Sequence, residues 1–137
     1  MKRLLSGLAY FWVLFTAAVW LYVSAEILRD PSQWTFGMGL VYTEGRAGLW
    51  VTLPASIVAL AGCILMWRRN AVGGWLLVAY GLFWGVALVG DVVREAYGIC
   101  FLGHKLLWLD ILVIQGVLGA LFLLVALWAW RNRNPAP

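Results

Sequence analysis

Four long apolar segments account for most of this chain, and none shows the alternation of apolar and polar residues that is expected of a half-buried strand. They cover Leu4–Leu28, Ala47–Trp67, Val72–Val93 and Leu106–Trp130. Each is at least as long as the roughly 20 residues that an α-helix needs to cross a bilayer. Within lipid the backbone must satisfy its own hydrogen bonds, and runs of this length do so as helices. We therefore predict one all-α membrane domain over residues 1–137, a bundle of four transmembrane helices.

The composition excludes a soluble domain of this size. Hydrophobic residues make up 64% of the 137 residues and charged residues only 12%, whereas soluble domains are about half apolar. The first apolar segment follows Lys2-Arg3 and ends near Val23-Ser24-Ala25, features that also occur in cleaved signal peptides. Its apolar stretch is about twice as long as in such peptides, so we expect it to remain as a membrane anchor. Cleavage would leave three spans.

Basic and acidic residues occupy opposite ends of these segments. Six of the ten basic residues lie at the ends that share the chain termini and the connection between the second and third segments. All six acidic residues lie at the other ends, together with four basic residues. Positive residues accumulate on the cytoplasmic side, which predicts cytoplasmic N and C termini in a bacterial cytoplasmic membrane. Because topology accounts for the positive charge, no nucleic-acid partner is expected.

The connection between the first two segments has a pattern of its own. From Trp34 to Leu40, large apolar side chains alternate with threonine or glycine. A period of two predicts a short extended segment with one apolar face. Such a segment would cap the bundle or dip into the membrane interface.

The two halves of the chain carry similar motifs in the same order. Glu26–Asp30 and Asp91–Glu95 both read acid, two apolar residues, arginine, acid. The second and fourth segments also begin alike, with a glycine followed five residues later by a tryptophan. These matches favour two parallel α-hairpin repeats, residues 1–70 and 71–134. Chance is the alternative explanation, because the apolar alphabet is small and helix ends favour acid–arginine pairs.

Charged side chains at the acidic ends of the segments form the candidate functional site. Charges at the centre of a membrane helix cost roughly 2.5–3.5 kcal/mol on insertion scales and mark function by default. The candidate cluster contains Glu26, Arg29, Arg46, Asp91, Arg94, His104 and Asp110. One interpretation is a network of ion pairs that fixes the helix register. The other is an outward-facing site for a proton, a cation or a polar headgroup.

Three residues deep in the predicted spans are candidates for the lining of a pocket. Trp12 and Trp84 lie near mid-membrane, where they either pack within the bundle or form the wall of a site for a lipid, pigment or quinone. Gln115 is the most polar residue deep in any span. We expect its amide to hydrogen-bond across the bundle, with Thr16 and Ser56 as candidate partners, or to bind a polar ligand group.

The sequence contains no set of residues typical of a catalytic, metal or cofactor site. One histidine and two distant cysteines do not supply the ligands of a haem, zinc or iron–sulfur centre. No phosphate-binding loop or hydrolase motif occurs either. We therefore assign no catalytic residue, no metal and no cofactor.

Two functions are compatible with these features. The favoured interpretation is a non-catalytic accessory or assembly subunit of a larger membrane complex, because the chain has almost no water-exposed domain. The alternative is a small transporter or membrane enzyme that binds a lipophilic or quinone-like ligand at the carboxylate and arginine cluster. The expected partners are the lipid bilayer and either other membrane proteins or further copies of this chain. Gly81 and Gly85 form a GxxxG motif that favours close helix packing within the bundle and is also compatible with a dimer.

Overall fold

Four long helices make up most of the computed structural model, which describes residues 2–30, 35–38, 41–96 and 108–133. Side chains are described for residues 2–30, 45–90, 92 and 113–133. The helices are α1 (Lys2–Arg29), α2 (Leu49–Trp67), α3 (Ala71–Ala96) and α4 (Trp108–Asn132). All four are long and apolar enough to cross a membrane. The four predicted spans are confirmed to within a few residues at each end, and the chain is an integral membrane protein.

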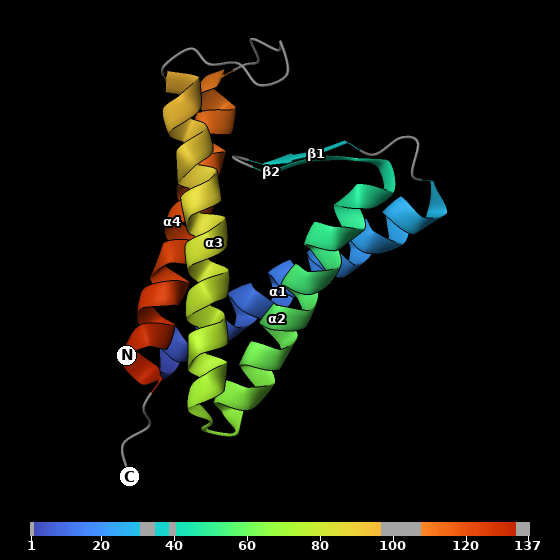
Figure 1. Ribbon diagram of the computed structural model, residues 1–137. Coiled ribbons are helices and arrows are strands. Elements are labelled where there is room, and N and C mark those ends of the chain that lie inside the picture. The colour runs from blue at the N-terminus through green and yellow to red at the C-terminus, as the bar shows by residue number, and fades with distance from the viewer. Residues whose placement is uncertain (1, 31–34, 39–40, 97–107, 134–137) are drawn as a thin grey trace.

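The all-α membrane fold is confirmed, and the connection between α1 and α2 adds a small two-stranded sheet. Strands β1 (Thr35–Met38) and β2 (Val41–Glu44) pair in antiparallel fashion. The alternation that predicted an extended segment corresponds to β1. A short 3₁₀ helix, η2 (Gly45–Gly48), follows β2 and leads into α2. Figure 1 shows the hairpin reaching from the start of α2 toward α3.

The helices form two antiparallel pairs, α1 with α2 and α3 with α4, joined by the short turn between α2 and α3. The pairs cross obliquely, and they are closest at the end that holds both chain termini (Figure 1). We call this the basic end, since Lys2, Arg3, Arg68, Arg69, Arg131 and Arg133 belong to it. The opposite end, with all six acidic residues, is the acidic end. The orientation in the membrane and the internal repeat stay predictions.

Glycines on α3 allow α4 to approach closely. A Cβ added at Gly81 would lie 2.5 Å from the carbonyl oxygen of Phe122, and one at Gly85 would lie 2.7 Å from Leu123 Cδ2. Small residues drive helix association where lipid offers no hydrophobic contrast. The GxxxG motif therefore serves packing within the chain. This confirms the expectation of close packing within the bundle, and the oligomeric state stays a prediction.

Buried polar side chains tie α1 to α3 near the middle of the membrane. The indole Nε1 of Trp20 donates to the hydroxyl oxygen of Tyr80 over 2.9 Å. The Tyr80 and Thr16 hydroxyl oxygens lie 2.7 Å apart, and Thr16 donates its own proton to the carbonyl oxygen of Val13. Tyr80 is therefore the donor to Thr16. Each of these three polar side chains thus has a partner in a region where an unsatisfied polar group would be costly.

A second polar contact ties α1 to α2. The hydroxyl oxygens of Ser24 and Thr52 lie 2.7 Å apart, and both residues are buried. Ser56 donates to the carbonyl oxygen of Thr52 over 2.8 Å. Hydroxyl groups thus hold the first pair where glycines hold the second.

Candidate functional site

The predicted polar cluster lies at the acidic end but is spread over several elements. Glu26 and Arg29 end α1, Arg46 lies in η2, Asp91 and Arg94 lie in the last turns of α3, and Asp110 lies in the first turn of α4. His104 lies outside the described residues. Glu26 is half-buried, whereas Arg29 and Arg46 are exposed. No ion pair joins these three side chains to one another where the structure describes them. The ion-pair network is therefore not seen among them.

Asp91 is placed on the core-facing side of α3. It follows Trp84 by seven residues, which is two turns, and Leu88 by three residues. Trp84 and Leu88 are 1% and 0% exposed. The Cα atom of Asp91 thus lies on the face of α3 that carries these buried residues, about 10 Å from Trp84 toward the acidic end.

Asp110 is placed on a different face and at a different level. A Cβ added at Gly119 would meet Val89 at 3.0 Å, so Asp91 lies roughly level with the residues just before Gly119. Asp110 lies about two turns farther out, roughly 10 Å along the axis. Its position on α4 also lines up with Ile114 and Val117, which are 57% and 54% exposed. The described helices therefore do not bring the two aspartates together.

An apolar hollow of about 240 Å³ lies between α2 and α3. Its walls include Trp50, Pro54 and Val58 from α2, with Ala79, Phe83 and Trp84 from α3. Trp84 is held by stacking on Trp20, with the ring centroids 4.3 Å apart. The volume is below the roughly 300–1,000 Å³ of sites that enclose a drug-sized ligand. The hollow therefore suits part of an apolar chain or one large apolar side chain.

Of the three predicted pocket residues, only Trp84 lines this hollow. Trp12 packs on Phe122 with the ring centroids 5.6 Å apart. Among the described residues, its buried Nε1 and the buried Oε1 of Gln115 have no hydrogen-bond partner. The expected bonds from Gln115 to Thr16 and Ser56 are not formed, since Thr16 bonds to Tyr80 and Ser56 to the α2 backbone.

Sequence reasoning missed two residues of this region, Tyr80 and Phe83. Tyr80 connects the wall of the hollow to the hydrogen bonds with Trp20 and Thr16. A signal for it was present, because a tyrosine near mid-membrane needs a partner for its hydroxyl group. Phe83 gave no such signal, since a phenylalanine in an apolar span carries no polar group to satisfy.

The fold and the site define an integral membrane protein with four spans and an apolar hollow between α2 and α3, which belong to different helix pairs. No protein-family model matches the chain, and no solved structure matches it. Among curated proteins, the chain is similar to a lipoprotein signal peptidase of Methylorubrum extorquens (strain PA1), with 39% identity over 96 residues. This alignment covers 61% of the chain and 56% of the relative. The chain thus spans about half the length of the curated relative that it matches. A bacterial relative supports the predicted cytoplasmic membrane.

Proposed function

We propose that this protein is a membrane enzyme that acts on a membrane-anchored peptide, with the apolar hollow as the binding site and Asp91 as the reactive carboxylate. The observation that supports the proposal is the spacing along α3, where Asp91 follows Trp84 of the hollow wall by seven residues, or two turns. The similarity to a lipoprotein signal peptidase supports a lipid-modified peptide as the substrate class.

The proposed role of Asp91 follows from the apolar hollow beside it and from its place near the acidic end. An apolar segment of the peptide packs against Trp50 and Phe83, which are exposed to the membrane on either side of the hollow. Such packing fixes the segment along α3, with the next part of the peptide directed toward the acidic end. A carboxylate there acts as a general base on water, a role worth about 10²–10⁴-fold in rate. Water reaches this level more easily than mid-membrane.

Asp110 has a separate part in the proposal. Carboxylates that share a proton lie about 3 Å apart, and the described helices keep Asp91 and Asp110 about two turns apart. We therefore assign the base to Asp91 alone. If Asp110→Asn removed activity as fully as Asp91→Asn, with substrate binding kept, the two would act as a pair after the helices shift.

The experiment is cleavage of a fluorogenic lipopeptide that carries an apolar signal segment, by the full chain in proteoliposomes. We expect Asp91→Asn to lower kcat/KM by about 100-fold or more, with lipopeptide binding unchanged by fluorescence anisotropy. Glu26→Gln is the matched control, because Glu26 is a carboxylate at the same end on α1, and its effect should stay below about 3-fold. Equal loss in both variants, or no cleavage by the wild type, contradicts the proposal.

The accessory-subunit interpretation predicts a different result. It requires that the protein co-purifies with other membrane chains in fixed proportion and retains no lipophilic molecule. The similarity to a peptidase favours the ligand-binding alternative over it. Native mass spectrometry after gentle extraction distinguishes the two.

A further inference from the structure

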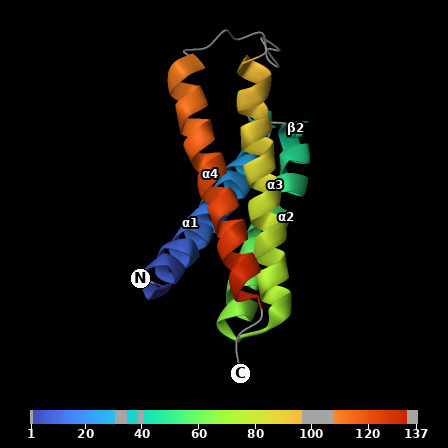
Figure 2. The same cartoon turned by 90° about the vertical axis from the view of Figure 1, so that its left-hand side faces the viewer.

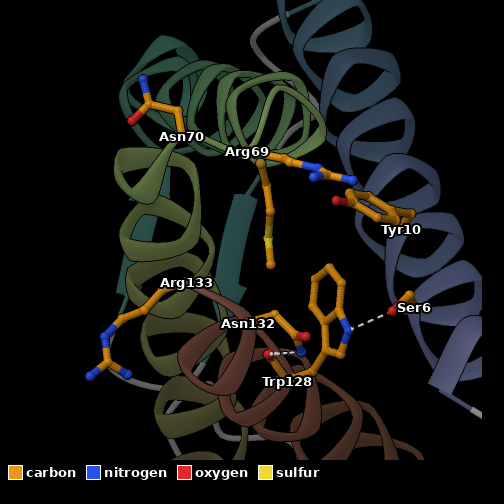
Figure 3. A pocket seen from close by; sticks show the side chains of 8 residues that line it. Ser6, Tyr10, Arg69, Asn70, Trp128, Asn132 and Arg133 are labelled. Carbon is orange, nitrogen blue, oxygen red and sulfur yellow. Dashed lines mark hydrogen bonds between the residues drawn. The ribbon is translucent and has the colours of Figure 1, made fainter. Parts of the chain in front are cut away.

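A second pocket lies at the basic end, at the opposite end of the bundle from Asp91. It has a volume of about 140 Å³ and is enclosed by α1, by α4 and by the turn between α2 and α3. Its lining includes Ser6, Tyr10, Met66, Arg69, Trp128 and Asn132 (Figure 3). It is far smaller than the roughly 300–1,000 Å³ of a site for a whole organic ligand. A compact polar group fits such a space.

The turn directs Arg69 into this pocket. Arg69 has a φ of 59°, in the left-handed region where glycine is usual at the residue after a helix cap. Its backbone N–H donates to the carbonyl oxygen of Met66 over 2.9 Å, and the Asn70 N–H donates to that of Leu65 over the same distance. This backbone conformation aims the Arg69 side chain across the pocket toward Tyr10 (Figure 3). In the described part of the chain, neither the guanidinium group of Arg69 nor the Tyr10 hydroxyl group has a hydrogen-bond partner.

The other polar side chains that line the pocket make hydrogen bonds within the protein, and Ser6 keeps a free donor. The Ser6 hydroxyl oxygen accepts from Trp128 Nε1 over 3.1 Å, so its own proton remains available. Asn132 donates to the carbonyl oxygen of Trp128 over 2.8 Å. Arg133 also lines the pocket, but its guanidinium group donates to the carbonyl oxygen of Trp130 over 2.6 Å and lies 3.6 Å from the Trp130 ring centroid. Ser6, Tyr10 and Arg69 thus each have a donor available at the pocket, and Arg69 is a cation.

No acidic side chain at this end offsets that positive charge. The basic end carries six of the ten basic residues and no acidic residue. An oxyanion with several acceptor oxygens therefore complements the pocket, and guanidinium groups match phosphate geometry well. The accumulation of positive residues on one side of a membrane explains why arginines are present. It does not explain why Arg69, although exposed, adopts a left-handed conformation and lines the pocket.

We propose that this pocket binds the phosphate group of an anionic phospholipid through Arg69, Tyr10 and Ser6. Basic pockets between transmembrane helices are known to hold such headgroups. A lipid is favoured over free phosphate because the exposed Leu4, Leu5 and Leu8 of α1 flank Ser6 and offer an apolar surface for acyl chains. This inference does not depend on the proposed function, since it concerns the other end of the bundle.

The test is native mass spectrometry of the full chain in detergent, titrated with phosphatidylglycerol or with phosphatidylcholine. We expect one retained phosphatidylglycerol, at least about 10-fold weaker binding in Arg69→Gln, and roughly 3-fold weaker binding in Tyr10→Phe. Arg68→Gln is the matched control, because it removes the same charge from an exposed neighbour that does not line the pocket, and it should change binding less than about 2-fold.

Two outcomes overturn the proposal. Equal weakening in Arg68→Gln and Arg69→Gln would mean that general surface charge attracts the lipid. Displacement of the lipid by millimolar inorganic phosphate would assign the pocket to a soluble anion. Circular dichroism and gel filtration verify that Arg69→Gln is folded, and Tyr10→Phe tests the pocket without any change of charge.

Discussion

The two ends of the bundle differ in how closely their helices approach one another. Near the basic end and the middle, a Cβ added at Gly73 or Gly81 would collide with backbone atoms of a neighbouring helix. Nearer the acidic end, a Cβ at Gly90 or Gly116 meets nothing within 4 Å in the described part of the chain. Figure 2 shows α3 and α4 separating in the same direction.

Glycines therefore have different structural roles at different positions along α3. Gly73 and Gly81 permit contact between backbones, and dispersion forces at that contact hold the bundle together. Among the residues that the structure describes, a Cβ at Gly90 faces no neighbour, although Val89 beside it still lies close to Gly119 of α4. The basic end has room only for a compact group beside Arg69. The hollow between α2 and α3, on the side of the acidic end, has room for a larger and more apolar group.

The largest expected effect comes from closing the space at Gly73. Gly73→Ala places a methyl group against the backbone of Met66, which cannot move as a flexible side chain can. We expect the free energy of unfolding to fall by about 3 kcal/mol, the upper end of the range for overpacking. Unfolding in mild detergent, followed by tryptophan fluorescence, measures it. A loss below 1 kcal/mol would mean that the basic end is not closely packed.

The buried hydrogen bonds of Tyr80 should have the next largest effect. Tyr80→Phe removes the acceptor for Trp20 and the donor to Thr16. Hydrogen bonds between membrane helices are worth roughly 0.6–1.7 kcal/mol each, so we expect a loss of about 1.5 kcal/mol. Tyr22→Phe is the control, because Tyr22 is 64% exposed. Equal losses from both variants would deny Tyr80 a role in joining α1 to α3.

Arg69→Gly should separate stability from ligand binding at the basic end. Because Arg69 has a φ of 59°, glycine relieves the left-handed conformation and should stabilise the protein by about 1 kcal/mol. The same variant should lose the anionic lipid. Arg68→Gly, at a φ of −78°, has no such strain to relieve and should not be stabilised. A higher unfolding temperature for Arg68→Gly than for Arg69→Gly would contradict this account.

The smallest effect is expected at the acidic end. Gly90→Ala adds a methyl group where nothing lies within 4 Å and exchanges glycine for a better helix former. We expect a gain of about 0.5–1 kcal/mol, measured in the same unfolding experiment as Gly73→Ala. A loss at Gly90 would show that α3 and its neighbours are packed at the acidic end as well.

The sequence predicted where the helices and strand β1 lie along the chain, but not which side of each helix faces the core. The spans were predicted from the lengths of four apolar runs, and β1 from apolar residues that alternate with a period of two. Because these helices are apolar on nearly all sides, the pattern does not reveal how each one is rotated. For this reason the pattern does not tell which of the clustered charged residues share a face; along the bundle the backbone positions of Asp91 and Asp110 lie about two turns apart.

The backbone conformation of the turn between α2 and α3 also does not follow from its sequence. In the sequence Arg68-Arg69-Asn70, asparagine is the residue best suited to a left-handed conformation, yet Arg69 adopts it. Asn70 instead accepts a hydrogen bond from the Val72 N–H over 3.0 Å and caps the start of α3. The basic pocket depends on this choice, and no pattern of apolar and polar residues predicts it.

Photo-crosslinking tests whether an apolar substrate binds in the hollow between α2 and α3. A benzoyl-phenylalanine at Phe83, which lines the hollow, is compared with one at Leu82, which does not line it; the two positions are 53% and 47% exposed. We predict that a lipopeptide with an apolar signal segment crosslinks at position 83 and not at position 82, in the wild-type background and equally in Asp91→Asn. Equal crosslinking at both positions, or none at either, would contradict the claim that an apolar substrate binds between α2 and α3.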